Sequence, residues 1–275
     1  MSAKRARVAV EDADVLITVG VALADTVLSQ LPEGHRIDLA PDQARIDGTV
    51  YPGIGLRQSL AILAAAVQTQ PCASRADLPP FDAAPDARGG LLDQRKLWAR
   101  VQDLLRPGDL LIADQGTACY GAAGLTLPDG AKLIGQPLWA PIGWTVPAAL
   151  GASLAAPDRR VVLIAGDAAV RPAAAELGTL LGQGLAPVII VLRPGGAGNE
   201  IPAWDWTALP AAMGPATSPV ALRVGTSHEL AWALNAASYH AGAGRPVLIE
   251  AVLGSGDVPP LLQELAQTLA IPVHQ

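Results

Sequence analysis

Short aliphatic runs alternate with helix-like patterns along most of the chain, and this alternation limits the folds available to it. Successive strand, helix and strand segments pack best when the helix crosses one face of a parallel strand pair. We therefore predict an α/β fold with a mostly parallel sheet and helices on both faces. The predicted strands are 15–19, 35–39, 109–113, 160–165, 187–192 and 246–252, and the helical patterns include 23–31, 56–68 and 93–105.

The composition changes between Thr69 and Gly90, where prolines, glycines and scattered acidic residues replace the periodic patterns. Segments of this kind connect domains, because they cannot bury a continuous apolar face. We expect two lobes separated by this stretch. The smaller is a partial domain at 1–75, the Pro-rich linker is 76–91, and the larger α/β domain is 92–275.

The charge balance argues against nucleic acid and membrane partners. Nineteen Lys and Arg residues against 25 Asp and Glu residues give a net charge of −6, which offers no overall attraction to polyanions. The uncharged stretch 133–157 is long enough to span a bilayer. Its prolines and glycines instead favour a strand, a loop and a helix of small residues. We expect no nucleic-acid partner and no membrane segment.

Cysteine usage bears on the cellular compartment. Cys72 and Cys119 are the only two cysteines, and no Cys/His spacing typical of zinc sites surrounds them. The sequence therefore predicts neither a disulfide framework nor a zinc site, and a reducing cytoplasm is the expected location.

Two carboxylates directly follow predicted strands, where ligands of open parallel sheets bind. Asp114 follows 109–113, and Asp167 follows 160–166 and precedes the helical pattern 172–183. Asp167 fits a metal ligand that bridges to a diphosphate near a helix start. The alternative is an aspartate that caps the helix, and the spacing alone leaves both open.

Three segments, in order, resemble one enzyme family. They are 108–121 (GDLLIADQGTACYG), 136–144 (QPLWAPIGW) and 159–167 (RRVVLIAGD), and the tail adds 204–206 (WDW) and 258–262 (VPPLL). Together they resemble the thiamine-diphosphate-dependent 2-oxo acid decarboxylases, with the indolepyruvate and pyruvate decarboxylases as the most similar group. The resemblance covers roughly residues 9 to 270.

The resemblance implies a domain plan. In this family a pyrimidine-binding domain, a Rossmann-like central domain and a diphosphate-binding domain follow one another. Residues 11–68 resemble the later half of the central domain, and 92–275 resemble the diphosphate-binding domain with its thiamine-diphosphate-binding fold. The pyrimidine-binding domain has no counterpart, so we expect a truncated form. The histidines match none of the family's catalytic positions and are expected at the surface or on helices: His35, His228, His240 and His274.

The resemblance also implies cofactor-binding positions. Gly116 and Thr117 match the loop that contacts thiamine diphosphate, and Ala140 falls where a backbone carbonyl meets the aminopyrimidine. Ile142 matches the apolar side chain that bends the cofactor, although it could also be ordinary core.

The diphosphate stretch departs from the family's Gly-Asp-Gly motif, because it reads Gly166, Asp167, Ala168, Ala169. Asp167 matches the first magnesium ligand, and its three neighbours match diphosphate-contacting positions. Ala168 replaces a glycine, which costs stability if the backbone there needs a positive φ.

A larger departure follows 188–192, where the family has its second metal ligand and a catalytic glutamate. An ungapped alignment puts Pro194 at the metal-binding asparagine, Gly196 at a further metal position and Glu200 at the catalytic glutamate. A second alignment moves 199–201 into the stretch before Trp204 and treats the metal loop as deleted. We favour the second, because 204–206 then stay in register.

Three functional hypotheses follow. The first is a degenerate decarboxylase, inactive alone, with thiamine diphosphate and magnesium as the family's cofactors. The second is a half-subunit that works with a separate pyrimidine-binding chain. The third is a non-catalytic partner of a full-length decarboxylase. Self-association into a homo-oligomer, or a partner chain, is expected because absent domains leave apolar surface uncovered.

Overall fold

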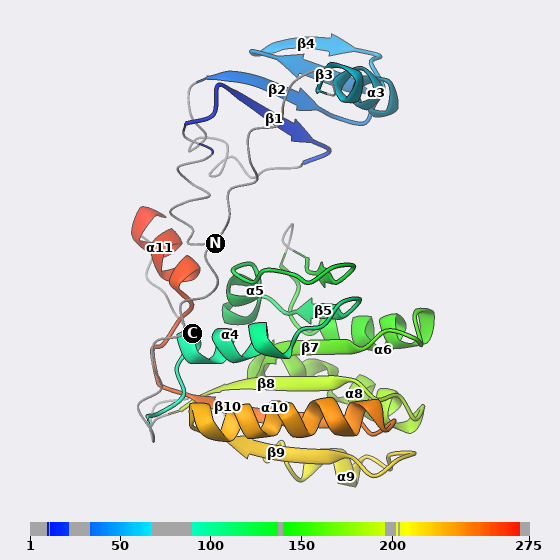
Figure 1. The fold of residues 1–275 in the computed structure, drawn as a ribbon, viewed down its shortest axis with the longest axis vertical. Coiled ribbons are helices and arrows are strands. Elements are labelled where there is room, and N and C mark those ends of the chain that lie inside the picture. Colours follow the sequence, from blue (N-terminus) through cyan, green and yellow to red (C-terminus); the bar gives the residue numbers. More distant parts are fainter. Residues whose placement is uncertain are drawn as a thin grey trace. The chain divides into compact units, whose positions relative to one another are not determined.

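The computed structural model describes residues 10, 12–21, 34–67, 90–136, 140–195, 202 and 204–269. The chain divides into two compact units, 1–79 and 80–275, and each has its own sheet (Figure 1). The predicted helix at 23–31 and most of the predicted linker lie outside the described residues.

The first unit is a small mixed sheet with one described helix. Strands β1 and β2 pair in parallel, whereas β2 with β3 and β3 with β4 pair antiparallel, in the order β1-β2-β3-β4. The element bounds are β1 Val15–Val19, β2 His35–Leu39, β3 Gln43–Ile46, β4 Thr49–Pro52 and α3 Leu56–Val67.

The hairpin of β3 and β4 was not predicted, although a local signal for it exists. Asp47 and Gly48 form the two-residue connection, and both have a positive φ, of 47° and 83°. Asp-Gly is a preferred pair for tight hairpins whose two central residues take this conformation. The two strands are short and mostly exposed, so no aliphatic run marks them.

The second unit is built on six strands, all paired in parallel, in the order β6-β5-β7-β8-β10-β9. The strand bounds are β5 Leu110–Ala113, β6 Lys132–Ile134, β7 Val161–Gly166, β8 Val188–Pro194, β9 Val220–Val224 and β10 Val247–Leu253. The helices are α4 Gln94–Leu104, α5 Thr117–Ala122, α6 Thr145–Ala155, α7 Asp167–Val170, α8 Ala174–Gly182, α9 Leu209–Ala212, α10 Ser227–Gly242 and α11 Pro260–Leu269, with a 3₁₀ turn at Arg171–Ala173. This confirms the predicted α/β class.

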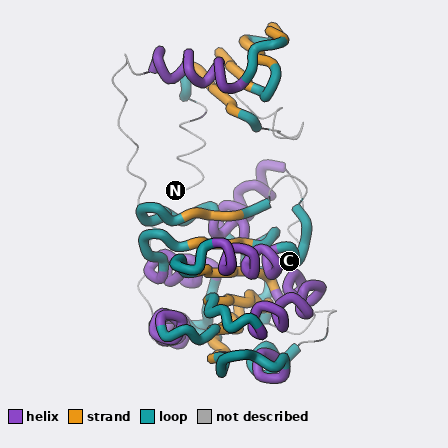
Figure 2. Tube along the Cα trace, turned by 90° about the vertical axis from the view of Figure 1, so that its right-hand side faces the viewer, coloured by secondary structure: helices purple, strands orange, loops and turns teal. Residues whose placement is uncertain are grey.

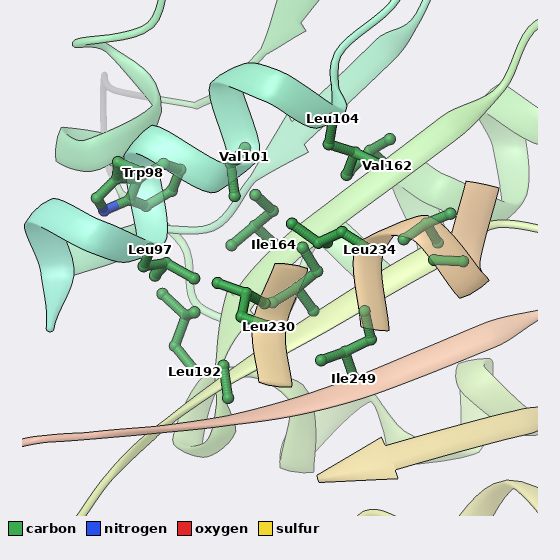
Figure 3. Close-up of a cluster of buried hydrophobic side chains, with 14 of the residues drawn as sticks. Leu97, Trp98, Val101, Leu104, Val162, Ile164, Leu192, Leu230, Leu234 and Ile249 are labelled. Atoms are coloured by element: carbon green, nitrogen blue, oxygen red, sulfur yellow. The ribbon is translucent and has the colours of Figure 1, made fainter. Parts of the chain in front are cut away.

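Helices cover both faces of this sheet, because alternate strand residues point to opposite sides. On one face, side chains of α4 and α10 meet Val162 and Ile164 of β7, as the labelled residues in Figure 3 show. On the other face, α6 and α8 pack against Leu163 and Ala165 of the same strand. Figure 2 shows the helices on either side of the strands.

The predicted strands of this unit agree with the structure, but β9 was not predicted. It lies at the sheet edge and is only partly buried, and Arg223 interrupts its apolar pattern. The uncharged stretch 133–157 forms most of β6, a connecting loop and α6. Among the described residues, no helix combines the length and the apolar character that crossing a membrane requires.

Candidate functional site

The strand order of the second unit singles out one place on the sheet. After β5 the chain passes through α5 to β6 on one side, and after β7 it passes through α8 to β8 on the other. The connections that leave the carboxyl ends of β5 and β7 therefore diverge. In open α/β sheets, ligands bind in the crevice that such a reversal creates. Asp114 follows β5 and Asp167 follows β7, so both carboxylates lie at this edge of the sheet.

Asp114 organises the edge from a fully buried position. Its Oδ1 accepts a hydrogen bond from the Gln115 amide at 2.7 Å. Its Oδ2 accepts from the Thr145 hydroxyl at 2.5 Å and from the Gly143 amide at 3.2 Å. Three donors satisfy the buried carboxylate, as its burial requires. These bonds tie the end of β5 to the start of α6 and to the loop before it.

That loop carries two predicted cofactor-binding residues. Ala140 has a φ of 48°, and Ile142 leaves 66% of its surface exposed. The interpretation of Ile142 as ordinary core is therefore wrong. A Cβ added to Gly143, whose φ is 86°, would lie 3.0 Å from the carbonyl oxygen of Ala169. The loop thus packs against α7, which follows the neighbouring strand.

The turn after β5 holds the other predicted cofactor-binding pair. Gly116 has a φ of 81° and precedes α5, and Thr117 is the first residue of that helix. Nothing lies within 4 Å of a Cβ built at Gly116, so the backbone conformation and not space requires glycine. The structure therefore brings this turn, the loop before α6 and the start of α7 to one edge.

Asp167 starts α7 immediately after Gly166. Its carboxylate accepts a hydrogen bond from Arg171 Nη2 at 2.8 Å. The helix start has no side-chain capping bond, and Gly166 occupies the cap position, so the capping interpretation of Asp167 is wrong. Ala168 lies within the helix and is not among the described non-glycine residues with positive φ, so the strain expected there does not arise.

Arg171 and Trp204 were not singled out as functional residues. The Arg171 guanidinium carbon lies 5.4 Å from the centre of the Trp204 ring, and Trp204 packs on the buried Trp206 with 5.5 Å between ring centroids. Arg171 follows Asp167 by four residues, a spacing that places opposite charges together on a helix. The spacing of Asp167 and Arg171 in the sequence was therefore a signal that could have identified this ion pair.

The described residues do not fit a magnesium ion at this edge. Magnesium requires near-octahedral oxygen ligation. In the part of the chain that the structure describes, no group of three His, Cys, Asp or Glu side chains is placed to hold a metal. The Asp167 carboxylate is paired with Arg171, and Pro194 has no side-chain oxygen. Gly196 and Glu200 lie outside the described residues, so their roles stay predictions.

Two further groups near the sheet are accounted for structurally. Burial, with a smaller contribution from the Asp114 carboxylate, raises the pKa of the Cys119 thiol, which keeps it protonated at neutral pH. Glu250, fully buried in β10, pairs with Arg193 at 2.6 Å and Arg223 at 2.7 Å. Arg193, next to the predicted metal loop, thus has an internal partner.

A cavity of about 650 Å³ lies at the opposite, amino edge of the sheet. Its arginines already bind the protein: Arg160 Nη2 donates to Asp109 Oδ2 at 2.6 Å, and Arg159 Nε donates to the Gly108 carbonyl at 2.6 Å. These bonds fix the starts of β5 and β7. The cavity therefore does not coincide with the edge that carries the predicted cofactor residues.

Comparisons with known proteins agree with the geometry. Residues 114–200 match the family model "Thiamine pyrophosphate enzyme, C-terminal TPP binding domain", which begins at the buried Asp114 and includes Asp167. This chain resembles the C-terminal half of a thiamine-diphosphate-dependent 2-oxo acid decarboxylase. The matched segment contains the whole edge described above.

Three of the similar relatives are named alpha-keto-acid decarboxylase. That of Mycolicibacterium paratuberculosis is 40% identical over 289 residues, which cover 97% of this chain and 50% of the relative. That of Mycobacterium ulcerans is 38% identical over 290 residues, covering 98% and 51%. A Mycobacterium tuberculosis relative is 38% identical over 288 residues, with the same coverage. The chain spans about half the length of the curated relatives that it matches.

Proposed function

We propose that this chain is the diphosphate-binding half of a 2-oxo acid decarboxylase, and that thiamine diphosphate binds at the carboxyl edge of β5 and β7. The observation that carries the proposal is the topological reversal between these strands, where the Gly116 turn, the Ala140 to Gly143 loop and the start of α7 converge. When bound, thiamine diphosphate supplies the electron sink that decarboxylation of a 2-oxo acid needs.

The residues at this edge suit the organic part of the cofactor. The exposed Ile142 side chain offers an apolar contact to a ring, and the buried Asp114 fixes the loop that carries it. The left-handed conformation of Ala140 turns the backbone sharply beside this contact. We assign Gly116 and Thr117 to the loop that contacts the cofactor. Gly166, Ala168 and Ala169 are assigned to the surroundings of the diphosphate.

We propose that the chain alone binds magnesium thiamine diphosphate weakly and does not decarboxylate 2-oxo acids at a useful rate. Asp167 is engaged by Arg171, and the resemblance covers only the half of the relatives that lacks the pyrimidine-binding domain. Proton-transfer groups typically raise a reaction rate by about 10²- to 10⁴-fold. Because such groups of the pyrimidine-binding domain have no counterpart in this chain, we expect activity to require the complementary half. We propose that a pyrimidine-binding chain supplies that half, that this chain also self-associates into a homo-oligomer, and that both act in the cytoplasm.

Complementation tests this function. The 275-residue chain is mixed with the separately expressed N-terminal half of the Mycolicibacterium paratuberculosis relative, and turnover of pyruvate, phenylpyruvate and indolepyruvate is followed by a coupled assay. We expect turnover by the mixture and none by either part. Calorimetry with thiamine diphosphate accompanies the assay. An inactive mixture whose parts form a complex favours the non-catalytic partner instead, and turnover by this chain alone contradicts the proposed need for a second half.

A further inference from the structure

We infer that the Arg171 guanidinium takes the place of a divalent metal ion at Asp167, so that this edge of the sheet binds its ligand without metal. The inference rests on the proposed function only for the identity of the ligand. Its structural basis is a conflict at Asp167. This residue matches a magnesium ligand by resemblance, but in this chain its carboxylate is paired with an arginine.

The first observation is the charge pairing. Arg171 Nη2 lies 2.8 Å from Asp167 Oδ2, and the two side chains are only 12% and 14% exposed. A carboxylate that is largely removed from water requires a compensating cation close by. Arg171 supplies that cation from within the chain, and its charge persists at every physiological pH.

The second observation is that independent contacts hold Arg171 in place. Its guanidinium lies over the Trp204 ring, which packs on the fully buried Trp206. A cation over a tryptophan face is attracted to the ring, and guanidinium groups suit this geometry. The cation is therefore part of a built arrangement and not a mobile surface side chain.

The third observation points to a ligand. Arg171 Nε is buried and has no hydrogen-bond partner among the described residues. A buried donor of this kind is costly unless an acceptor satisfies it. Because the donor belongs to a cation, its preferred acceptor is an anionic oxygen, such as that of a phosphate group. The guanidinium thus holds Asp167 with Nη2 and keeps one buried donor, Nε, without an acceptor in the described part of the chain.

The fourth observation concerns the metal ligands that the described residues near Asp167 could supply. At the end of the neighbouring strand β8, Pro194 has no side-chain donor to a metal, and the Gly195 amide is bound to the Leu253 carbonyl at 2.5 Å. Within the described part of the chain, Asp167 belongs to no group of three or more His, Cys, Asp or Glu side chains that could hold a metal. One carboxylate already neutralised by arginine does not retain magnesium.

Metal response without cofactor is the primary test. Calorimetry and thermal unfolding of the full chain are run with MgCl₂ and with EDTA. We expect no saturable binding of magnesium and melting temperatures that agree within about 1 °C. Arg171→Gln removes the internal cation, so its melting temperature should fall by about 5 °C or more and partly recover with magnesium. No such recovery is expected in the double variant Asp167→Asn/Arg171→Gln, which also lacks the carboxylate. None is expected in Arg245→Gln, which serves as a control arginine substitution away from Asp167.

Saturable magnesium binding to the unmodified chain that Asp167→Asn abolishes would overturn the inference, as would an Arg171→Gln variant indifferent to magnesium. If Arg171→Gln does not fold, Arg171→Lys serves instead, because its ammonium keeps the charge and should keep the indifference to metal.

Thiamine diphosphate binding, measured in EDTA and in magnesium, distinguishes a failure of this inference from a failure of the proposed function. Equal affinity in both buffers, lost in Arg171→Gln, supports the inference. Binding only with magnesium overturns it. Binding in neither buffer, even with the complementary half present, contradicts the proposed function.

Discussion

The bond between Thr145 and Asp114 offers a quantitative test of how the site is held. Thr145→Val keeps the shape of this fully buried side chain but removes the hydroxyl that donates to Asp114 Oδ2 at 2.5 Å. A hydrogen bond to a charged group contributes about 1.5–3 kcal/mol. For a unit of this size, each kcal/mol lowers the melting temperature by about 2–4 °C. We therefore expect a decrease of about 3–12 °C.

Thr145→Ser is the matched control. It retains the hydroxyl and loses one methyl group, at a cost of about 0.8 kcal/mol. All six tryptophans of the chain lie in the second unit, so urea unfolding followed by tryptophan fluorescence reports on this unit alone. A Thr145→Val variant as stable as the unmodified protein, or more stable than Thr145→Ser, would refute the role given to Asp114.

Other predictions address the backbone and the pH response. Gly143→Ala should destabilise the chain by at least about 1–2 kcal/mol, because φ at Gly143 is positive and the Ala169 carbonyl is close. Gly151→Ala lies in the open middle of α6 and should instead stabilise the chain by about 0.5–1 kcal/mol in the same unfolding assay. The backbone amides of Gly225 and Thr226 lower the pKa of Glu229 below its ordinary value of 4.5. The stability that the Glu229 carboxylate adds is therefore present above pH 4.5 and is lost as the pH falls through its folded-state pKa. Melting temperatures measured from about pH 6 to about pH 3 should therefore vary less in Glu229→Gln than in the unmodified chain.

The sequence predicted the parallel sheet well because its central strands are buried on both faces. The runs that became β7, β8 and β10 are almost continuously aliphatic, as strands covered by helices on both sides must be. The hairpin around Asp47 and the edge strand β9 lack this signal, since they are largely exposed or partly buried. Their formation depends on turn conformation and on pairing with a neighbour.

The candidate site was predicted in position but not in chemistry. The rule that ligands bind at the carboxyl edge located Asp114 and Asp167, and the structure places both there. Sequence reasoning treated Asp167 as a metal ligand or a helix cap because it considered the residue alone. The pairing with Arg171 required the helix to start at Asp167 itself, several residues before the predicted helical pattern, and the contact with Trp204 joins segments far apart in the chain.

Hydrogen–deuterium exchange of the full chain, with and without excess thiamine diphosphate, tests the central claim most directly. The account predicts slower exchange in three segments at the carboxyl edge, namely 115–117, 140–145 and 166–171. The amino edge, with Arg159 and Arg160 at its cavity, provides an internal reference that should not change. Protection confined to the amino edge, or no protection in any segment at concentrations that saturate binding, would contradict the assignment of the cofactor site.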